Sequence, residues 1–256
     1  MKLFQYWDTG DPPDEVAGWI EGFRAMNPEM QHRLYDRDSA SWFIGKHIGE
    51  RERRAFDLIA VPSMQSDYFR YCAVWAKGGA YVDADFQPLA PLAGLLDQAP
   101  RSMMLVWDGH MVAGLMMSRA PRDAFLRACL DLATNCVEDR WGKNAYMAAG
   151  PGVINALRLL ADPASRPFVE RGFDNVFGRT WGFPELLERA KREIAITDEI
   201  VEALKAMTLR HVFQTPTWIG TQPPAYKGSG RHWLRWQGSI YEPAASTCRL
   251  MSAPVR

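Results

Sequence analysis

The first third of the chain alternates between sequence patterns typical of strands and patterns typical of helices. Residues 3–7 and 31–35 are predicted to be strands, and residues 14–26 between them carry apolar side chains at helical spacing. A further helical stretch at residues 39–59 is expected to break near Gly49. Because strands that alternate with helices usually form one sheet with crossover helices, this order predicts an α/β fold.

Later elements follow the same pattern, with more helix towards the carboxyl end. Strands are expected at residues 103–107 and 114–118, and helices at 122–134, 153–160 and 185–207, the last divided near Thr197.

Size and charge limit the classes of protein that this chain can belong to. A chain of 256 residues with 47% apolar and 23% charged residues favours one globular domain with helical additions and excludes a disordered chain. The formal net charge is zero, which argues against a general nucleic-acid or anionic-membrane binder. A local basic patch remains compatible with that balance.

Targeting signals and cysteine patterns point to a soluble protein of the cytoplasm. The four cysteines are widely spaced without a CxxC pair, so reduced thiols are expected. The first residues are too polar for a signal peptide, and no apolar run approaches the ~20 residues of a membrane span. Peripheral contact with a membrane-bound acceptor stays open.

The most informative stretch is residues 62–92. It predicts a helix that Ser63 or Ser66 could cap and that ends at Gly78 and Gly79, since glycine adopts the left-handed conformation of a helix end without steric strain.

A short strand at residues 80–82 then leads into Asp83 and Asp85. If the segment stays extended, both carboxylates point to one side, and their repulsion calls for a nearby cation. A divalent ion such as magnesium or manganese suits hard carboxylate oxygens. A solvated acidic turn is the alternative reading of this spacing.

Asp67 and Arg70 share a face of the preceding helix because they lie three residues apart. They could form an ordinary ion pair within the helix, or they could bind the hydroxyl groups of a sugar.

Together these residues resemble a known family. The matching pattern reads Ser66-Asp67-x-x-Arg70-Tyr71 and then Gly78-Gly79-x-Tyr81-x-Asp83-x-Asp85. It is similar to the glycosyltransferases with a DXD sugar-binding region, which include yeast-type α-mannosyltransferases, bacterial capsular polysaccharide transferases and clostridial glucosylating toxins. Weaker similarity extends to Phe4-Gln5-Tyr6-Trp7, to residues 114–118 and to Ala149-Gly150-Pro151.

The resemblance implies a GT-A type fold, an α/β domain with a Rossmann-like, mostly parallel sheet flanked by helices. One domain would span residues 1–256. Residues 1–120 would form the nucleotide-sugar-binding core, and residues 121–256 a helical, acceptor-side part with a closing tail.

The resemblance also assigns roles to single residues. Asp85 would be the main protein ligand of Mn²⁺ or Mg²⁺, and Asp83 would contact the ribose or donor sugar and reach the metal through water. Both would be catalytic. The expected donor contacts are Asp67 and Arg70 on the sugar, Tyr81 lining the site and Trp7 stacked on the base, although a tryptophan in the core is equally compatible with the sequence at position 7.

The carboxyl-terminal part is expected to complete this site. By the same resemblance His232 would complete the metal site, with His211 as second candidate, and Lys227, Arg231 and Ser239 could contact phosphate oxygens. Ala113 stands where the family often has asparagine, which puts part of the sugar-side hydrogen bonding in question.

The expected activity is metal-dependent, configuration-retaining transfer of a hexose from a UDP- or GDP-sugar to a hydroxyl of a glycan, a lipid-linked glycan or a protein, as in polysaccharide or glycoconjugate synthesis. The alternatives are a nucleotide-sugar-binding module without turnover and a phosphatase of the haloacid-dehalogenase type. The phosphatase reading is disfavoured because Gly78 and Gly79 precede the motif and Gln87 follows it, where that class has an apolar strand and Thr or Val.

Overall fold

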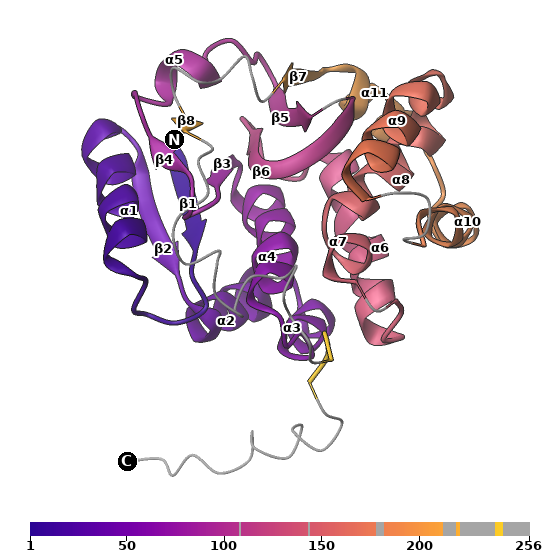
Figure 1. Ribbon diagram of the computed structural model, residues 1–256, viewed down its shortest axis with the longest axis horizontal. Coiled ribbons are helices and arrows are strands. Elements are labelled where there is room, and N and C mark those ends of the chain that lie inside the picture. Colours follow the sequence, from indigo (N-terminus) through magenta and orange to yellow (C-terminus); the bar gives the residue numbers. More distant parts are fainter. Residues whose placement is uncertain (108, 143, 178–181, 212–218, 221–238, 243–256) are drawn as a thin grey trace.

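A six-stranded sheet organises the molecule in the computed structural model, which describes residues 1–107, 109–142, 144–177, 182–211, 219–220 and 239–242 (Figure 1). The strand order is β2-β1-β3-β6-β5-β7. The strands are β1 (Lys2–Tyr6), β2 (Gln31–Tyr35), β3 (Gly79–Val82), β5 (Ser102–Trp107), β6 (His110–Ser118) and β7 (Met207–His211).

One strand of the six runs against the others. β1 pairs in parallel with β2 and β3, and β5 pairs in parallel with β7, whereas β6 is antiparallel to both β3 and β5. The sheet is therefore mixed but mostly parallel, as expected, and the other five strands end at one edge, here called the carboxyl edge. The opposite edge, where they begin, is the amino edge. A separate two-stranded pair joins β4 (Gln87–Pro88) to β8 (Ile219–Gly220).

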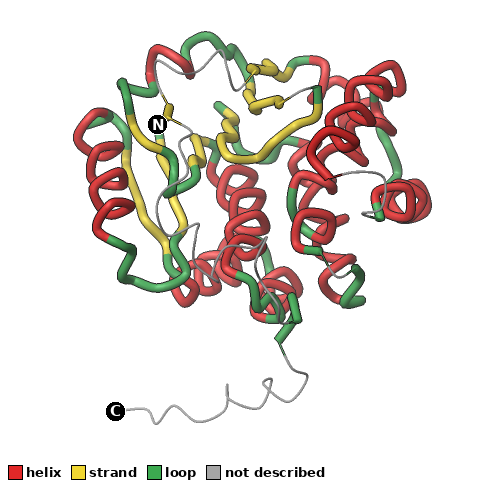
Figure 2. Tube along the Cα trace, viewed as in Figure 1, coloured by secondary structure: helices red, strands yellow, loops and turns green. Residues whose placement is uncertain are grey.

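Helices cover both faces of the sheet (Figure 2). In the first half they are α1 (Asp14–Met26), α2 (Arg37–His47), α3 (Glu50–Asp57), α4 (Pro62–Lys77) and α5 (Ala93–Leu96). In the second half they are α6 (Ala124–Glu138), α7 (Ala145–Ala148), α8 (Pro151–Ala161), α9 (Arg166–Phe177), α10 (Phe183–Glu193) and α11 (Asp198–Lys205), with a 3-10 turn at Pro163–Ser165.

Alternating side chains of the strands divide the core into two layers. Phe4 and Tyr81 face the larger layer, which holds α4 and α6, whereas Leu3 and Val82 face the smaller layer with Phe23 of α1. This is the two-residue period of a sheet that is buried on both faces.

Most of the amino-terminal predictions are confirmed. α1 and β2 have the expected bounds, β1 lies one residue earlier than expected, and the long helical stretch breaks at Gly49 into α2 and α3. The start of α4 differs from the prediction, since Val61 occupies the cap position and Pro62 begins the helix. Proline is favoured there because its missing N–H has no partner in a first helical turn, so neither serine is needed as a cap.

The end of α4 requires glycine. Gly78 and Gly79 have φ angles of 61° and 98°, and a Cβ on Gly79 would lie 2.5 Å from the carbonyl oxygen of Lys2. The two glycines therefore let the chain leave α4 and enter β3 against the backbone of β1.

The second half contains elements that the sequence did not predict. α9 and β7 are both additions, and β6 begins at His110, four residues before the expected strand. The predicted division near Thr197 is confirmed, because the Thr197 side chain accepts a hydrogen bond from the Ile200 N–H and caps α11. None of the helices in the described part of the chain combines the length and apolarity that a bilayer crossing needs.

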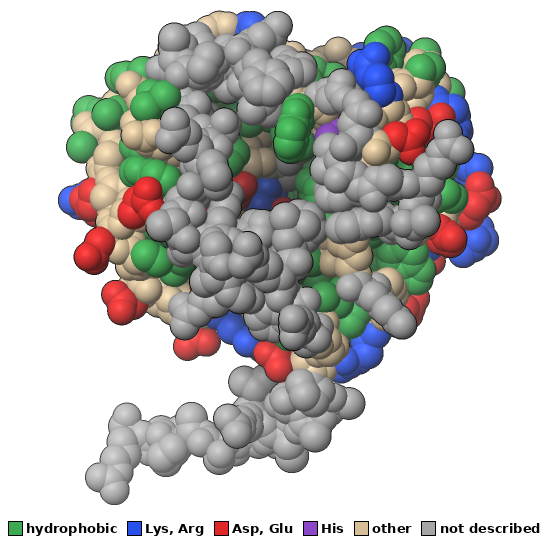
Figure 3. Space-filling model, viewed as in Figure 1, with side chains coloured by type: hydrophobic (Ala, Val, Ile, Leu, Met, Phe, Trp, Pro, Cys, Tyr) green, Lys and Arg blue, Asp and Glu red, His purple; other side chains and the backbone are tan. Residues whose placement is uncertain are grey.

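Charged side chains of both signs are scattered around the margin of the face drawn in Figure 3, in keeping with the zero net charge.

Candidate active site at the carboxyl edge of the sheet

Two adjacent parallel strands end where the predicted site residues begin. Trp7 follows β1 and Asp83 follows β3. The Asp83 N–H donates to the carbonyl oxygen of Gly114 in β6 over 2.8 Å, so the backbone at Asp83 remains fixed to the sheet beyond the end of β3. Open α/β sheets bind ligands at this edge.

The chain turns directly after Asp83. The Phe86 N–H donates to the Asp83 carbonyl oxygen at 3.1 Å, which closes a turn that contains Asp85. The expectation that both aspartates lie on one extended segment is therefore wrong. The turn still places both carboxylates in one loop at the carboxyl edge, and each residue is partly buried.

Arg70 connects α4 to this loop. Its side chain is only 4% exposed, and its Nη2 lies 2.8 Å from Asp67 Oδ1 and 3.0 Å from Asp83 Oδ1. The ion pair within the helix thus exists, but it extends to a third residue from a different element. The Arg70 guanidinium offsets the charge of Asp83.

Tyr81 and Ser66 lie behind Arg70 and hold it in place. The Arg70 guanidinium carbon lies 4.8 Å from the centre of the Tyr81 ring, and its Nη2 donates to Ser66 Oγ at 3.1 Å. The hydroxyl groups of Ser66 and Tyr81 share a hydrogen bond of 2.7 Å. Tyr81 is fully buried, so the structure places it beneath Arg70 rather than on the open surface of the site.

The charges in this network shift one another's pKa. Burial raises the pKa of Asp67 to about 6, against the opposing effect of Arg70. Burial disfavours the charge on Arg70, but the carboxylates of Asp83 and Asp67 more than offset this and hold its pKa above the usual value. Arg70 is therefore always charged, and Asp67 changes its charge near pH 6.

Two glycines allow the close packing of this network, and sequence reasoning gave neither a role in it. A Cβ on Gly114 would overlap Phe86 Cζ and lie 3.0 Å from Asp83 Oδ2. A Cβ on Gly150, which precedes α8, would lie 2.7 Å from Asp67 Oδ2. The Tyr71 hydroxyl also donates to the Gly150 carbonyl oxygen at 3.1 Å and ties α4 to the start of α8. The signal that could have found them is that both glycines lie within segments of the family resemblance.

Trp7 lies beside the aspartate loop. It is partly buried and packs against Val16, Ile20 and Ala84, the residue between the two aspartates. The structure therefore brings Trp7, Asp67, Arg70, Asp83 and Asp85 to one region, as the resemblance implied.

The remaining candidates are placed only in part. His232, Lys227 and Arg231 lie outside the described residues. His211 ends β7 at the carboxyl edge, and its side chain is not described. Ser239 is exposed and accepts a hydrogen bond from the Tyr241 N–H at 3.1 Å. Ala113 lies in β6 next to Gly114, and its side chain is likewise outside the description.

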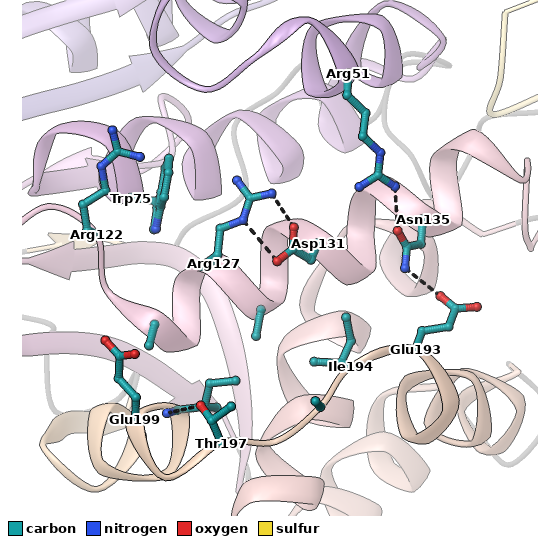
Figure 4. A pocket seen from close by; sticks show the side chains of 14 residues that line it. Arg51, Trp75, Arg122, Arg127, Asp131, Asn135, Glu193, Ile194, Thr197 and Glu199 are labelled. Carbon is teal, nitrogen blue, oxygen red and sulfur yellow. Dashed lines mark hydrogen bonds and ion pairs between the residues drawn. The ribbon is translucent and has the colours of Figure 1, made fainter.

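A groove of about 540 Å³ lies away from this site, between α6 and the connection from α10 to α11 (Figure 4). Several of its polar side chains pair with one another, as in Arg127–Asp131 and Asn135–Glu193. None of the four charged site residues lines it. We therefore do not assign it to the donor.

The carboxylates at this site are suitable for a hard divalent cation only in part. Asp83 and Asp85 supply carboxylate oxygens from one loop, but Arg70 already engages Asp83 Oδ1. Among the described residues no cluster of three or more His, Cys, Asp or Glu side chains could hold a metal. A metal bound here would take its other ligands from a diphosphate or from elsewhere in the chain.

The fold is of a known type. A mixed, mostly parallel sheet with helices on both faces and an acidic loop at its carboxyl edge is similar to the fold of GT-A type glycosyltransferases. A solved structure, the "PaToxG Glycosyltransferase", has this fold and superposes with a TM-score of 0.50 at 14% sequence identity, covering 75% of this chain and 84% of that one.

Sequence comparison finds a family match in the amino-terminal part. Residues 13–102 match the family described as "Glycosyltransferase sugar-binding region containing DXD motif". The chain is also 30% identical over 89 residues to the "Initiation-specific alpha-1,6-mannosyltransferase" of Schizosaccharomyces pombe. That match covers 32% of this chain and 22% of the relative, so the chain spans about a fifth of the relative's length.

Proposed function

We propose that this protein is a metal-dependent glycosyltransferase that moves a hexose from a nucleotide diphosphate sugar to an acceptor hydroxyl. The observation that carries the proposal is the buried Arg70, which joins Asp67 of α4 to Asp83 beside Asp85 at the carboxyl edge. These residues lie within the stretch that matches the sugar-binding region.

Arg70 and its two carboxylates form a rigid surface for sugar hydroxyls. Carboxylate oxygens accept hydrogen bonds from hydroxyl groups and guanidinium N–H groups donate to them. Because Ser66 and Tyr81 fix the guanidinium from behind, little side-chain entropy is lost when a sugar binds. Asp67 and Arg70 would orient the hexose, and Asp83 would contact the ribose or the sugar.

Asp85 is assigned to the metal because Arg70 already engages Asp83 Oδ1 at 3.0 Å, and because the resemblance to the DXD family implies that the second aspartate of the motif is the main metal ligand. A bound Mn²⁺ or Mg²⁺ would offset the negative charge that develops on the departing diphosphate. His232 or His211 remains our candidate for a further ligand. Asp85 would therefore act by holding this cation.

Trp7 is assigned to the nucleotide base. Its ring packs against Val16, Ile20 and Ala84, just after the end of β1. Aromatic rings held in this way stack on bases with little selectivity between them. Trp7 would thus contribute affinity, and other contacts would distinguish UDP from GDP.

We further propose that transfer retains the anomeric configuration, through attack on the same face that the phosphate leaves. The acceptor would be a hydroxyl of a glycan, a lipid-linked glycan or a protein. The buried free thiols of Cys72, Cys129 and Cys136 support a reducing compartment, the cytoplasm, as the place of reaction.

The test compares donor binding and hydrolysis in the wild type and Asp85→Ala. Calorimetry with UDP and GDP, with and without Mn²⁺, is expected to show metal-dependent binding of one nucleotide that the variant loses. Hydrolysis of the corresponding nucleotide hexose should fall by about 10²–10³-fold, the effect of losing one group that stabilises developing charge. Asp97→Ala is the matched control, because Asp97 is a 77% exposed aspartate at the other edge of the sheet. Wild-type rates in Asp85→Ala would contradict the metal assignment.

The same experiment addresses the second candidate, a nucleotide-sugar-binding module without turnover. Ala113 favours the binding module, because the family often has an asparagine at this position. Metal-dependent binding without hydrolysis or transfer to any acceptor would support the module over the enzyme.

A further inference from the structure

The amino edge of the sheet gathers cations from segments that are far apart in the sequence. We call this set the amino-edge patch. It consists of Lys2, Lys46, Lys77, Arg101, Arg119 and Arg122.

Strand order explains why they meet. Lys2 begins β1, Lys77 ends the helix that leads into β3, Arg119 follows β6 and Arg101 precedes β5. Since β1, β3, β6 and β5 are successive neighbours, these four cations form a row across the edge. At about 4.8 Å between strands the row is roughly 15 Å long.

Two further cations extend the row towards the helices. α2 ends at this edge with Lys46 and His47, and Arg122 donates its N–H to the Trp75 carbonyl oxygen at 2.7 Å. The Arg122 guanidinium carbon lies 4.0 Å from the centre of the Trp75 ring. The patch is therefore wider than a single row of strand ends.

Acidic partners are scarce here. Arg119 pairs with Asp97 at 3.4 Å, whereas none of the other five cations forms an ion pair with any residue in the described part of the chain. Glu29, in the loop before β2, also lies at this edge, and Asp123 next to Arg122 is buried as the cap of α6. The local charge is strongly positive although the chain is neutral.

The cations lie close enough to affect one another. Partial burial and the charges of Lys2, Lys46 and Arg122 lower the pKa of Lys77, and no carboxylate among the described residues opposes them. A ligand that brings negative charge would remove this repulsion. It would have to be broad, because the charges are spread over several strands.

An exposed aromatic residue adjoins the patch. Trp42 of α2 is 61% exposed, and Lys46 Nζ lies 4.4 Å from the centre of its ring. Tryptophan beside lysine is typical of the boundary between lipid headgroups and acyl chains, where the ring is half immersed and the ammonium meets phosphate. A nucleic acid would satisfy the cations but gives no equal reason for an exposed indole beside them.

We propose that the amino-edge patch binds the surface of a membrane that contains anionic lipids, with the carboxyl edge and its site turned away from the bilayer. The inference does not depend on the transferase activity. It concerns a different edge of the sheet, and its test measures no turnover.

The experiment is co-sedimentation of the full chain with lipid vesicles. Binding is expected to vesicles of equal parts phosphatidylcholine and phosphatidylserine, not to phosphatidylcholine alone, and to weaken as salt screens the charges. Lys46→Gln combined with Lys77→Gln should lower the vesicle partition coefficient about 25-fold, from roughly fivefold for each cation near an anionic surface. Trp42→Ala should lower it several-fold and leave the salt dependence in place.

A matched control changes two cations on other helices. Lys191 of α10 and Arg166 of α9 are exposed and pair with Glu188 and Glu170, so Lys191→Gln with Arg166→Gln should bind vesicles like the wild type. The proposal would be overturned if the control lost as much vesicle binding as the double lysine variant. It would also be overturned if the wild type bound neutral vesicles equally well, or if the folded wild type bound no vesicles. Binding to duplex DNA without binding to anionic vesicles would overturn it in favour of a nucleic acid.

Discussion

Positive charge is buried and paired at one edge of the sheet, and exposed and largely unpaired among the described residues at the other. At the carboxyl edge Arg70 is 4% exposed and lies between two carboxylates, with a tyrosine ring beneath it. At the amino edge five of the six cations of the patch lack an acidic partner among the described residues, and they remain near solvent.

Solvation explains the difference. Water stabilises an exposed lysine or arginine without a partner, whereas a buried guanidinium needs carboxylates and hydrogen bonds to replace the water it lost. The stability of the protein is therefore expected to be sensitive to changes in charge or shape at the carboxyl edge. Substitutions at the amino edge should leave stability unchanged and mainly affect binding.

The largest expected effect is on stability at Arg70. Arg70→Met leaves Asp67 and Asp83 facing each other without their cation, and it should lower the unfolding free energy by about 3–5 kcal/mol. Arg101→Gln, at the exposed edge, should change it by less than about 0.5 kcal/mol. Urea denaturation measures both, and similar losses in the two variants would contradict the contrast between the edges.

A smaller effect should appear in the pH dependence of stability. The pKa of Asp67 is about 6 in the folded protein and 3.8 in its ordinary state, so the folded protein binds the proton more tightly. The resulting stabilisation is complete below pH 4 and is lost as the pH rises through 6, by up to about 3 kcal/mol.

Asp67→Asn removes this titrating group, so its stability provides the reference for the wild type at each pH. Urea unfolding from pH 4 to pH 7 should show the wild type losing stability relative to the variant, and parallel profiles would refute the raised pKa. Lys77 lies at the amino edge, away from Asp67, so Lys77→Gln should leave the difference between the wild type and Asp67→Asn unchanged.

The smallest stability effect is expected at Gly114, together with a loss of activity. Gly114→Ala forces a methyl group against Phe86 and Asp83, which should cost about 1–3 kcal/mol and slow donor hydrolysis by displacing Asp83. Gly18→Ala is the matched control, because that exposed position in α1 has no atom within 4 Å of a new Cβ, and it should stabilise by about 0.5–1 kcal/mol. Equal hydrolysis rates in the two variants would show that Asp83 tolerates the displacement.

Much of the local structure could be predicted from short sequence patterns. The bounds of α1 and β2, the break at Gly49 and the glycine end of α4 follow from helical spacing and from the conformational freedom of glycine, which act over a few residues. Three separate sequence motifs also indicated the residues that meet at the site, namely Trp7, Asp67 with Arg70, and Asp83 with Asp85.

Other features could not be predicted because they depend on residues distant in sequence. The antiparallel direction of β6 and the addition of β7 beside β5 are decided by packing. A turn at Asp85 is found where an extended segment was expected. The burial of Tyr81 behind Arg70 likewise follows from how α4 lies on the sheet.

The sequence by itself determined the α/β class, the main helices and strands of the amino-terminal part and the identity of the sugar-binding motif, because each depends on spacing along a continuous segment. Only the tertiary structure decided that Arg70 pairs with Asp83, and that cations in or next to β1, α4, β5 and β6 form one patch. Electrostatic interactions act through space, and strand order, which no local pattern specifies, sets which charges become neighbours.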